Sequence, residues 1–411
     1  MKILFIVPYV PNLIRVRPFN LIRCLSEHGH CVTVLTLWSD EQEREDMKQL
    51  GQYCHDVQAA HLPKWRSLLN CLTALPTPKP LQAVYCWDQS LARQITSIVH
   101  SNNGYELFDV IHVEHLRGAH YGLHCKAFLP QIPVVWDSVD CISLLFLQAT
   151  MRSKKRFSRL ITSFELNRTQ KYECKLVKGF NHTLVTSPTD RDALISLAPP
   201  NETVPDITVL PNGVDLDYFM PDRTVSREPA TLVISGKMSY HANISMVMYL
   251  VQSIMPIIWS RRPDVQLCIV GKDPSSEIQA FANKPGITVT GTVNDIRPFL
   301  QKATIAVAPL TYGAGIQNKV LESLACATPL ISTPQAVSAL KVQPGREVLV
   351  ANEPGEFAGL VLYLLDNPHY QQRLGEAGRQ YVEQNHRWST ITRQLEGVYD
   401  EVIDAKQRVR T

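Results

Sequence analysis

The sequence has no long apolar run and no closely spaced cysteines. No uninterrupted apolar stretch reaches the roughly 18 residues that a membrane-spanning helix needs. The first apolar stretch, residues 3–10, contains Pro8, is followed by Pro11 and lacks a small-residue cleavage site, so it indicates a buried strand rather than a signal peptide. The ten cysteines are scattered. Their spacing argues against a disulfide framework and a structural zinc site, and it is typical of buried thiols in a reducing cytoplasm.

The charge is nearly balanced along most of the chain. The 411 residues carry a formal charge of +3, with 45% hydrophobic and 19% charged residues, which is typical of a globular protein of two domains. The segment from Arg152 to Lys178 is different, because it has nine Lys or Arg residues and only two acids, Glu165 and Glu173. Such a basic face suits an anionic surface such as phospholipid head groups, although a solvated helix face has the same composition. No recognised nucleic-acid-binding module accompanies it, so no nucleic-acid partner is predicted.

Short apolar segments alternate with segments of helical spacing, and this pattern runs twice. Strands are predicted in the first half at 2–10, 31–37, 108–115, 133–138 and 182–187, and in the second half at 230–236, 265–271, 287–291, 304–310, 329–334 and 347–351. Helical segments between them include 19–28 and 90–100. Continuous apolar strands separated by helices favour parallel sheets that are covered on both faces. The predicted fold class is therefore α/β, with two Rossmann-like doubly wound domains.

Proline and glycine mark the boundary between the two halves. Pro211, Gly213 and Pro221 punctuate the connection, and an amphipathic helix at 390–409 follows Trp388. The predicted domains are 1–212, 213–388 and a C-terminal helix at 389–411 that packs back on the first domain. Because doubly wound domains bind ligands at the carboxyl ends of their strands, the site is expected in a cleft between the two domains.

Five segments, in the right order, resemble glycosyltransferase family 4, the group 1 glycosyltransferases. They are VLPNGVDLDYF (209–219), VISGKM (233–238), IVGKDP (269–274), GITVTGTVNDIRPFL (286–300) and APLTYGAGIQNKVLESLACATPLIST (308–333). The helix with the pattern G-I-x-N-K-x-L-E resembles the bacterial branch that acts in exopolysaccharide and cell-envelope assembly. The resemblance implies a GT-B fold, in which two facing domains enclose the cleft, the N-terminal domain binds the acceptor and the C-terminal domain binds the donor.

The resemblance also implies an activity. It is the retaining, metal-independent transfer of a sugar from a UDP- or GDP-sugar to a glycan or lipid-linked acceptor, without a cofactor. The predicted location is the cytoplasm, with possible peripheral contact with an anionic membrane at its inner face. A non-catalytic regulatory or scaffold protein that keeps nucleotide binding is the alternative from another class. A sugar-nucleotide epimerase or a phosphorylase on the same frame fits the segments at 209–219 and 315–322 less well.

Each part of a nucleotide sugar is expected to meet a different group. Glu322 is expected to accept two hydrogen bonds from the ribose diol. Gly313, Ala314 and Gly315 are expected to open a helix near Gly315, so that free amides face the diphosphate.

A second loop is expected to bring a cation to the same diphosphate. It contains Gly236 and Lys237, and the segment that follows does not contain an obvious second cation. The base is expected near Thr292 and Val293, while Asp295 is expected to cap the next helix. The remaining predicted donor contacts are Ile316, Gln317, Asn318 and Lys319.

Two positions depart from the family pattern. The first of the family's two glutamates, eight positions before Glu322, is Ala314 here. In related enzymes that group contacts the transferred sugar, so Gln317 or Asn318 is expected to hold the sugar hydroxyls instead. The loop after the first strand has no glycine, and Arg17 in it is expected to approach the phosphates from the first domain.

Acidic and histidine side chains follow two strands of the first domain. Glu114 and His115 follow one strand, and Asp137 and Asp140 follow the next. Strand ends are where catalytic groups of such domains lie. The predicted catalytic set is His115, Asp137 and Lys237, with Glu114 beside them, and a purely structural hydrogen-bonding role for His115 is equally consistent with the sequence.

Overall fold

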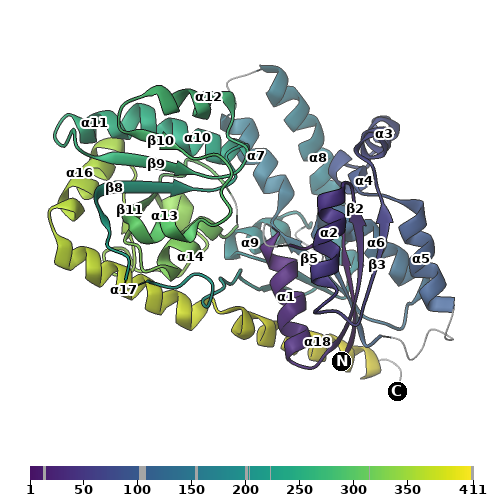
Figure 1. Ribbon diagram of the computed structural model, residues 1–411. Coiled ribbons are helices and arrows are strands. Elements are labelled where there is room, and N and C mark those ends of the chain that lie inside the picture. The colour runs from purple at the N-terminus through teal and green to yellow at the C-terminus, as the bar shows by residue number, and fades with distance from the viewer. Residues whose placement is uncertain are drawn as a thin grey trace. The chain divides into compact units, whose positions relative to one another are not determined.

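The computed structural model describes residues 1–12, 15–100, 108–152, 156–199, 202, 204–222, 224–313 and 315–408, and the chain folds into two compact units (Figure 1). Unit 1 comprises Met1–Pro211 and Trp388–Thr411, and unit 2 comprises Asn212–Arg387. Each boundary lies one residue before the position that the sequence suggested.

Unit 1 is built on a parallel sheet with the strand order β3-β2-β1-β4-β5-β6-β7. Its strands are β1 (Lys2–Val7), β2 (Cys31–Trp38), β3 (Asp56–His61), β4 (Val110–Glu114), β5 (Val134–Val139), β6 (His182–Val185) and β7 (Ile207–Val209). Its helices are α1 (Val16–Glu27), α2 (Glu41–Leu50), α3 (Lys64–Ala74), α4 (Leu81–Tyr85), α5 (Gln89–His100), α6 (His115–Phe128), α7 (Ile142–Arg152), α8 (Arg156–Gly179), α9 (Pro188–Ser196) and α18 (Trp388–Arg408).

Both faces of this sheet are buried. Along β1, Phe5 belongs to one apolar cluster and its neighbours Leu4 and Ile6 belong to another, because successive side chains of a strand point to opposite faces. The cluster around Phe5 includes Trp388 and Tyr399 of α18. The C-terminal helix therefore packs on the core of unit 1.

Unit 2 repeats the design with the strand order β10-β9-β8-β11-β12-β13, again with parallel pairings. Its strands are β8 (Glu228–Ser235), β9 (Gln266–Val270), β10 (Ile287–Val289), β11 (Ala303–Ala308), β12 (Leu330–Ser332) and β13 (Leu349–Val350). Its helices are α10 (His241–Tyr249), the π-helix η1 (Leu250–Ile254), α11 (Met255–Trp259), α12 (Ser276–Gln279), the 3₁₀-helix η2 (Ala280–Asn283), α13 (Arg297–Lys302), α14 (Asn318–Ala325), α15 (Pro334–Val337), α16 (Pro354–Leu365) and α17 (Pro368–Asn385). The predicted α/β class with two Rossmann-like sheets is confirmed.

Three predicted features differ from the structure. Strands β3 and β7 were not predicted, because β3 buries only Ala60 and β7 has three half-buried residues, so neither edge strand has the apolar run of a central strand. Strand β1 ends at Val7 rather than continuing to residue 10, because Pro8 has no N–H to donate to a neighbouring strand.

One continuous helical segment of unit 2 is apolar over an unusual length. Among the residues that the structure describes, 241–259 is the one helix long and apolar enough to cross a membrane, by length and composition alone. Half of it is buried, and Met246, Leu250 and Ile258 belong to the core of unit 2. A core helix of a globular domain has the same properties.

Candidate functional site

The loop after β8 is held tightly at the carboxyl edge of the unit 2 sheet. Gly236 has a φ of +146°, and a Cβ atom there would lie 2.8 Å from Asn243 Nδ2 and 3.3 Å from Lys319 Cε. Only glycine allows this close approach without strain. The Asn243 amide donates to the carbonyl of Lys237 at 2.9 Å, while the Lys237 side chain is exposed. The loop is therefore fixed by its backbone and leaves one cation free to reach a ligand.

A second glycine allows this loop to pack closely against the loop after β9. Gly271 has a φ of +154°, and a Cβ atom on it would lie 1.7 Å from the carbonyl oxygen of Gly236. The backbone N–H of Met238 donates to the carbonyl of Lys272 at 2.8 Å across the same contact. The two loops therefore touch through backbone atoms, with no room for a side chain.

Gly271→Ala is expected to destabilise unit 2 by about 3 kcal/mol or more, because the overlap is with backbone and cannot be relieved by a side-chain movement. The matched control is Gly291→Ala, where φ is +68° but no atom lies within 4 Å of the new Cβ. The control is expected to lose only about 1–2 kcal/mol, the cost of the left-handed backbone. Urea unfolding of both variants measures the difference, and equal losses would contradict the close contact.

Helix α14 begins later than the sequence analysis expected. Its first residue is Asn318 and its N-cap is Gln317, whereas the predicted start was near Gly315. Gly313 and Gly315 have φ values of +158° and +66°, which a right-handed helix cannot contain, so both lie in the turn before it. Ala314 lies outside the described residues. The amides that α14 offers to an anion are accordingly those of its own first turn.

The start of α14 carries a lysine and a glutamate three residues apart. Lys319 Nζ donates to Gln317 Oε1 at 3.0 Å. Burial lowers the pKa of Lys319 to about 8, and the charge of Glu322 opposes that shift. Burial raises the pKa of Glu322 to about 7, and the charge of Lys319 opposes it. In the described part of the chain no donor lies within hydrogen-bonding distance of the Glu322 carboxylate, which leaves both its oxygens available to a ligand.

Lys319 also supplies a second cation near Lys237, which the sequence around Lys237 does not contain. Because its Cε lies beside Gly236, α14 brings a second cation to the loop after β8. Gly236, Gln317, Lys319 and the backbone of Lys237 therefore form one neighbourhood. This contact joins positions more than 80 residues apart, so no local spacing reveals it.

The other predicted donor residues differ in how far their side chains are available to a ligand. Asn318 Oδ1 accepts from Asn212 Nδ2 at 3.3 Å, and the Ile316 side chain is buried in the core of unit 2 rather than presented to a ligand. Thr292 is exposed and Val293 is half-buried, in the loop after β10.

That loop follows β10 at the carboxyl edge of the sheet, the same edge from which the loop before α14 leaves β11. Strand β10 is three strand spacings from β11, or roughly 14 Å at the usual spacing. The N-cap residue of α13 is Ile296, one position after the predicted cap, but Asp295 Oδ1 still accepts from the N–H of Arg297, the first residue of the helix, at 2.9 Å. Two cavities of unit 2, of about 790 and 580 Å³, contain none of the predicted donor residues.

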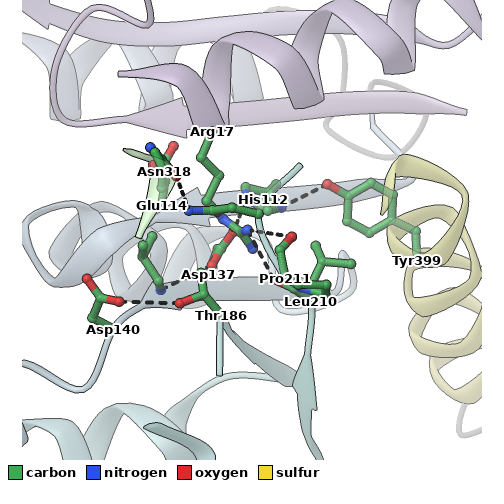
Figure 2. A network of polar contacts seen from close by, with 12 residues as sticks. Arg17, His112, Glu114, Asp137, Asp140, Thr186, Leu210, Pro211, Asn318 and Tyr399 are labelled. Atoms are coloured by element: carbon green, nitrogen blue, oxygen red, sulfur yellow. Dashed lines mark hydrogen bonds and ion pairs between the residues drawn. The ribbon is translucent and has the colours of Figure 1, made fainter. Parts of the chain in front are cut away.

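A buried polar cluster occupies the carboxyl side of the unit 1 sheet (Figure 2). Arg17 Nε lies 2.8 Å from Asp137 Oδ2, and both side chains are almost fully buried. Arg17 Nη1 donates to the carbonyls of Leu210 at 3.0 Å and Pro211 at 3.3 Å. The sequence predicts that Arg17, after the first strand, approaches the phosphates from the first domain. This prediction is wrong, because Arg17 lies in α1 and its guanidinium is buried, where a carboxylate and two carbonyls bind it.

His112 connects this cluster to the C-terminal helix. Its Nε2 lies 3.8 Å from Asp137 Oδ2, its Nδ1 lies 2.8 Å from the hydroxyl of Tyr399, and its ring stacks on Phe5 at 4.1 Å (Figure 2). Burial lowers the pKa of His112 to about 4, against the opposing effect of Asp137. The ring is therefore neutral at neutral pH, and α18 contributes directly to the order of this cluster.

Glu114 and Asp137 are paired across β4 and β5. The hydroxyl of Tyr9 donates to Glu114 Oε1 at 3.0 Å. Burial, with a further contribution from the charge of Asp137, raises the pKa of Glu114 to about 8, although Arg17 opposes the shift. Glu114 is consequently protonated at neutral pH and acts as a neutral hydrogen-bonding group.

Glu114→Gln is expected to change how stability depends on pH. Between pH about 4.5 and 8 the folded protein keeps a proton on Glu114 that the unfolded chain has lost, so the wild type loses stability as pH rises through this window. Glutamine has no such proton. Between pH 5 and 8 the free energy of unfolding of the wild type is therefore expected to fall by a few kcal/mol, roughly, relative to that of the glutamine variant. Denaturant unfolding at several pH values measures the difference, in which the other titrating groups cancel. A constant difference would contradict the raised pKa.

His115 occupies a strained position at the end of β4. Its φ is +65°, a conformation that costs a residue with a Cβ atom about 1–2 kcal/mol. Its Nδ1 accepts from the N–H of Arg117 at 3.2 Å, so the neutral ring carries its proton on Nε2. Burial, followed by the charge of Arg117, lowers the pKa of His115 to about 3. His115 is half-buried and is suited to donate a hydrogen bond rather than to accept a proton.

Asp140 lies near a second carboxylate. Thr186 Oγ1 donates to Asp140 Oδ1 at 3.3 Å (Figure 2). Burial raises the pKa of Asp140 to about 7, and the charge of Asp190 adds to the shift. Val139 between Asp137 and Asp140 has a φ of +67°, which is rare for a β-branched residue. Backbone strain therefore occurs at the ends of both β4 and β5, where such domains usually hold functional groups.

Unit 1 also contains a cavity of about 190 Å³ that the sequence analysis missed. It lies at the carboxyl ends of β1, β2 and β3, and its wall includes aromatic and cationic side chains: Tyr9, Arg15, Trp38, Lys64, Tyr85 and Arg117. Arg15 lies over the ring of Tyr9 at 4.7 Å and pairs with Glu43 at 2.8 Å. Its residues come from many separate elements, so no motif marks it in the sequence.

Comparison with known protein families gives two matches in tandem. A model described as Glycosyltransferase Family 4 matches residues 16–218, and a model described as Glycosyl transferases group 1 matches residues 229–367. The two matches correspond closely to the main body of unit 1 and to unit 2.

Curated relatives match part of the chain. The D-inositol 3-phosphate glycosyltransferase 2 of Catenulispora acidiphila is 27% identical over 224 residues, which cover 48% of this chain and 51% of that protein. The phosphatidyl-myo-inositol mannosyltransferase of Mycobacterium tuberculosis is 25% identical over 219 residues, or 50% of this chain and 57% of that protein. The chain thus spans about half the length of the curated relatives it matches.

Solved structures match nearly the whole chain. Sucrose-phosphate synthase from Thermosynechococcus elongatus has a TM-score of 0.68 and 16% identity, and the match covers 98% of this chain and 100% of that one. The HepE protein of Anabaena in complex with UDP and glucose has a TM-score of 0.69 and 13% identity, with the same coverage. At such identities these structures establish the similarity of the fold.

Proposed function

Because this chain belongs to the group 1 glycosyltransferases of the GT-B fold, we propose that it transfers a sugar from a nucleotide-diphosphate sugar to an acceptor in cell-envelope or polysaccharide assembly. The observation that carries the proposal is the neighbourhood of Gly236, Lys319 and Glu322 in unit 2. The Lys319 side chain contacts the glycine loop, and Glu322 follows one helical turn later without a hydrogen-bond donor among the described residues, which supports a nucleotide site here.

The donor is proposed to bind with its ribose at Glu322 and its diphosphate at the glycine loop. A carboxylate can accept both hydroxyl protons of a ribose diol. Lys237 and Lys319 then supply positive charge to the diphosphate, as do the first amides of α14. The binding of a diphosphate would raise the pKa of Lys319 again, since a nearby negative charge favours the protonated amine.

The sugar and base are assigned to the flanking loops. Gln317 and Asn318 are proposed to hold the sugar hydroxyls in place of the carboxylate that Ala314 lacks. The base is proposed to lie against the backbone of Thr292 and Val293. A UDP-sugar and a GDP-sugar both satisfy this arrangement.

The transfer itself is proposed to retain the configuration at the anomeric carbon and to need no metal ion. The bond between the anomeric carbon and the diphosphate oxygen breaks, the acceptor oxygen attacks from the same face, and its proton passes to the departing diphosphate. The protein's contribution is to position the two substrates and to stabilise the charge on the leaving group. Lys237 and Lys319 would do the latter.

The acceptor is proposed to be a glycan or a lipid-linked molecule bound by unit 1. Tyr9, Trp38 and Tyr85 offer aromatic rings to a sugar, and the cations of the cavity suit an acceptor with a negative charge. His115, through its Nε2–H, and Asp137, through the backbone that it orders, are proposed to align the acceptor at the ends of β4 and β5. We further propose that the protein acts in the cytoplasm at the inner face of the cell membrane.

The experiment is to incubate the purified chain with UDP-glucose or GDP-mannose and to follow the anomeric proton of the sugar by NMR. Transfer or slow hydrolysis with retained configuration, at the same rate with and without EDTA, is the expected result. Turnover with inversion would overturn the proposed stereochemistry, and a rate lost on chelation would overturn metal independence. Binding of the nucleotide without any turnover would favour the scaffold alternative.

A further inference from the structure

Helix α3 presents its large apolar side chains outward. Trp65, Leu68, Leu69 and Leu72 are 65%, 60%, 49% and 62% exposed, respectively. Their spacing of three and four residues places all four on one face of the helix. Leu75, at the end of the helix, is 44% exposed and extends the same row. These five side chains are called the α3 stripe.

The opposite face of α3 packs on unit 1 through small and polar groups. Ser67 and Ala74 are buried, and the amide of Asn70 donates to the carbonyl of Trp87 at 2.8 Å. Surface helices of globular proteins normally bury their apolar face. Helix α3 is oriented the other way round, and Figure 1 shows it at the edge of unit 1, beyond α4. An apolar row of this length at the surface usually marks a site of interaction.

Helix α8 enlarges this surface. Arg168 donates to the carbonyls of Leu75, Thr77 and Lys79, which fastens the chain after α3 to α8. The same guanidinium lies 4.1 Å from the centre of the Phe164 ring, which is 50% exposed. Phe164 is therefore a further exposed apolar group beside the end of the α3 stripe.

The charged groups on α8 near this surface are cationic. Lys171 and Lys175 are exposed and lie seven and eleven positions after Phe164, on the same face of α8. The two acids of this part of α8, Glu165 and Glu173, are 6% and 0% exposed, so they add no negative charge to the surface.

The segment around α3 also has more basic than acidic residues. It contains no Asp or Glu between Asp56 and Asp88. Arg66 pairs with Asp88 at 3.2 Å, while Lys64 and Lys79 are exposed. The surface thus combines an apolar row with a cationic rim.

We propose that the α3 stripe, Phe164 and the exposed lysines of α8 form a surface that docks on an anionic lipid bilayer. A bilayer offers acyl chains to the leucines, an interface that suits Trp65, and phosphates to the lysines. A second copy of the chain fits less well, because a dimer that pairs this surface with itself would bring two cationic rims together. The basic segment 152–178 alone left a solvated face as an equal alternative, and the reversed orientation of α3 is the new observation.

Docking has a consequence for the acceptor. Lys64 and Ser67 of α3 line the cavity of unit 1, so docking through α3 would bring that cavity close to the lipid surface. A lipid-linked acceptor could then enter the cavity without leaving the membrane. This consequence rests on the proposed transfer, whereas the docking itself does not.

The experiment is co-sedimentation of the full chain with vesicles of phosphatidylcholine alone or with phosphatidylglycerol added, in the absence of any donor. The wild type is expected to bind the anionic vesicles and to be released by high salt. Leu68→Ser with Leu72→Ser is expected to weaken binding at least about tenfold. Lys171→Gln with Lys175→Gln is expected to weaken it by about fivefold for each lysine. The matched control, Ile195→Ser with Tyr363→Ser, removes two exposed apolar groups elsewhere and is expected to bind like the wild type.

Each other outcome overturns the proposal. It fails if the wild type does not bind anionic vesicles at low salt, or if the serine pair at Leu68 and Leu72 binds as well as the control pair. It also fails if that pair abolishes a concentration-dependent dimer without changing vesicle binding, because the occupant would then be a second copy. Circular dichroism of each variant separates lost docking from lost folding. Since no donor is present, failure here leaves the proposed transfer untouched.

Discussion

Glu322→Ala is expected to abolish nucleotide binding while leaving the fold intact. The carboxylate is proposed to accept two hydrogen bonds from the ribose, and a hydrogen bond to a charged group is worth about 1.5–3 kcal/mol. Losing both weakens binding by at least about a hundredfold. A nucleoside diphosphate at about a hundred times its wild-type dissociation constant stabilises the wild type by about 2.7 kcal/mol and this variant by less than about 0.5 kcal/mol. Thermal unfolding with and without nucleotide measures both values.

Two further variants make this test specific. Glu322→Gln keeps one carbonyl acceptor without the charge and is expected to fall between the wild type and the alanine variant. Glu376→Ala removes an exposed helix carboxylate of the same unit and is expected to bind nucleotide like the wild type. Without nucleotide all three proteins are expected to unfold close to the wild-type temperature, because no hydrogen bond to a described residue depends on the Glu322 carboxylate. Unchanged affinity in Glu322→Ala would show that the ribose site lies elsewhere.

Arg17→Met is expected to destabilise unit 1 by about 3–5 kcal/mol, because it leaves the buried Asp137 carboxylate without its counter-charge. Methionine keeps much of the volume of arginine, so the effect reports charge rather than a cavity. Urea unfolding of the wild type and the variant measures the loss.

The double variant Arg17→Met with Asp137→Asn tests the cause. Removing both charges is expected to recover a large part of the loss, since no uncompensated charge remains. Lys48→Met breaks the exposed pair of Lys48 and Glu45, 2.6 Å apart, and is expected to change stability little. A double variant as unstable as Arg17→Met would mean that packing or the carbonyl contacts of Arg17, rather than its charge, hold the cluster.

The sequence predicted the central strands because burial leaves a continuous apolar pattern in them. It failed at β3 and β7, whose edge positions bury few side chains. It also placed the start of α14 too early, because glycines can open a helix as well as precede it. The φ values of Gly313 and Gly315 decide between the two, and these depend on tertiary contacts such as the one from Gln335 to the carbonyl of Gly313, at 2.7 Å.

Site residues on one loop were easier to predict than those joined across the fold. Gln317, Lys319 and Glu322 lie within six positions, so a motif can identify them. The pair of Arg17 and Asp137 spans 120 positions and had no sequence signal. The cavity of unit 1 likewise needs the fold to bring its side chains together. Helix α3 could not be oriented from its pattern either, because an apolar face predicts burial and here it is exposed.

The most direct measurement of the central claim is the thermal stabilisation of the full chain against a panel of nucleotides and sugar nucleotides. We predict a saturable increase of a few kcal/mol, roughly, with the diphosphates and sugar nucleotides of one base, which also identifies that base. The absence of any shift across the whole panel would contradict a donor site in unit 2.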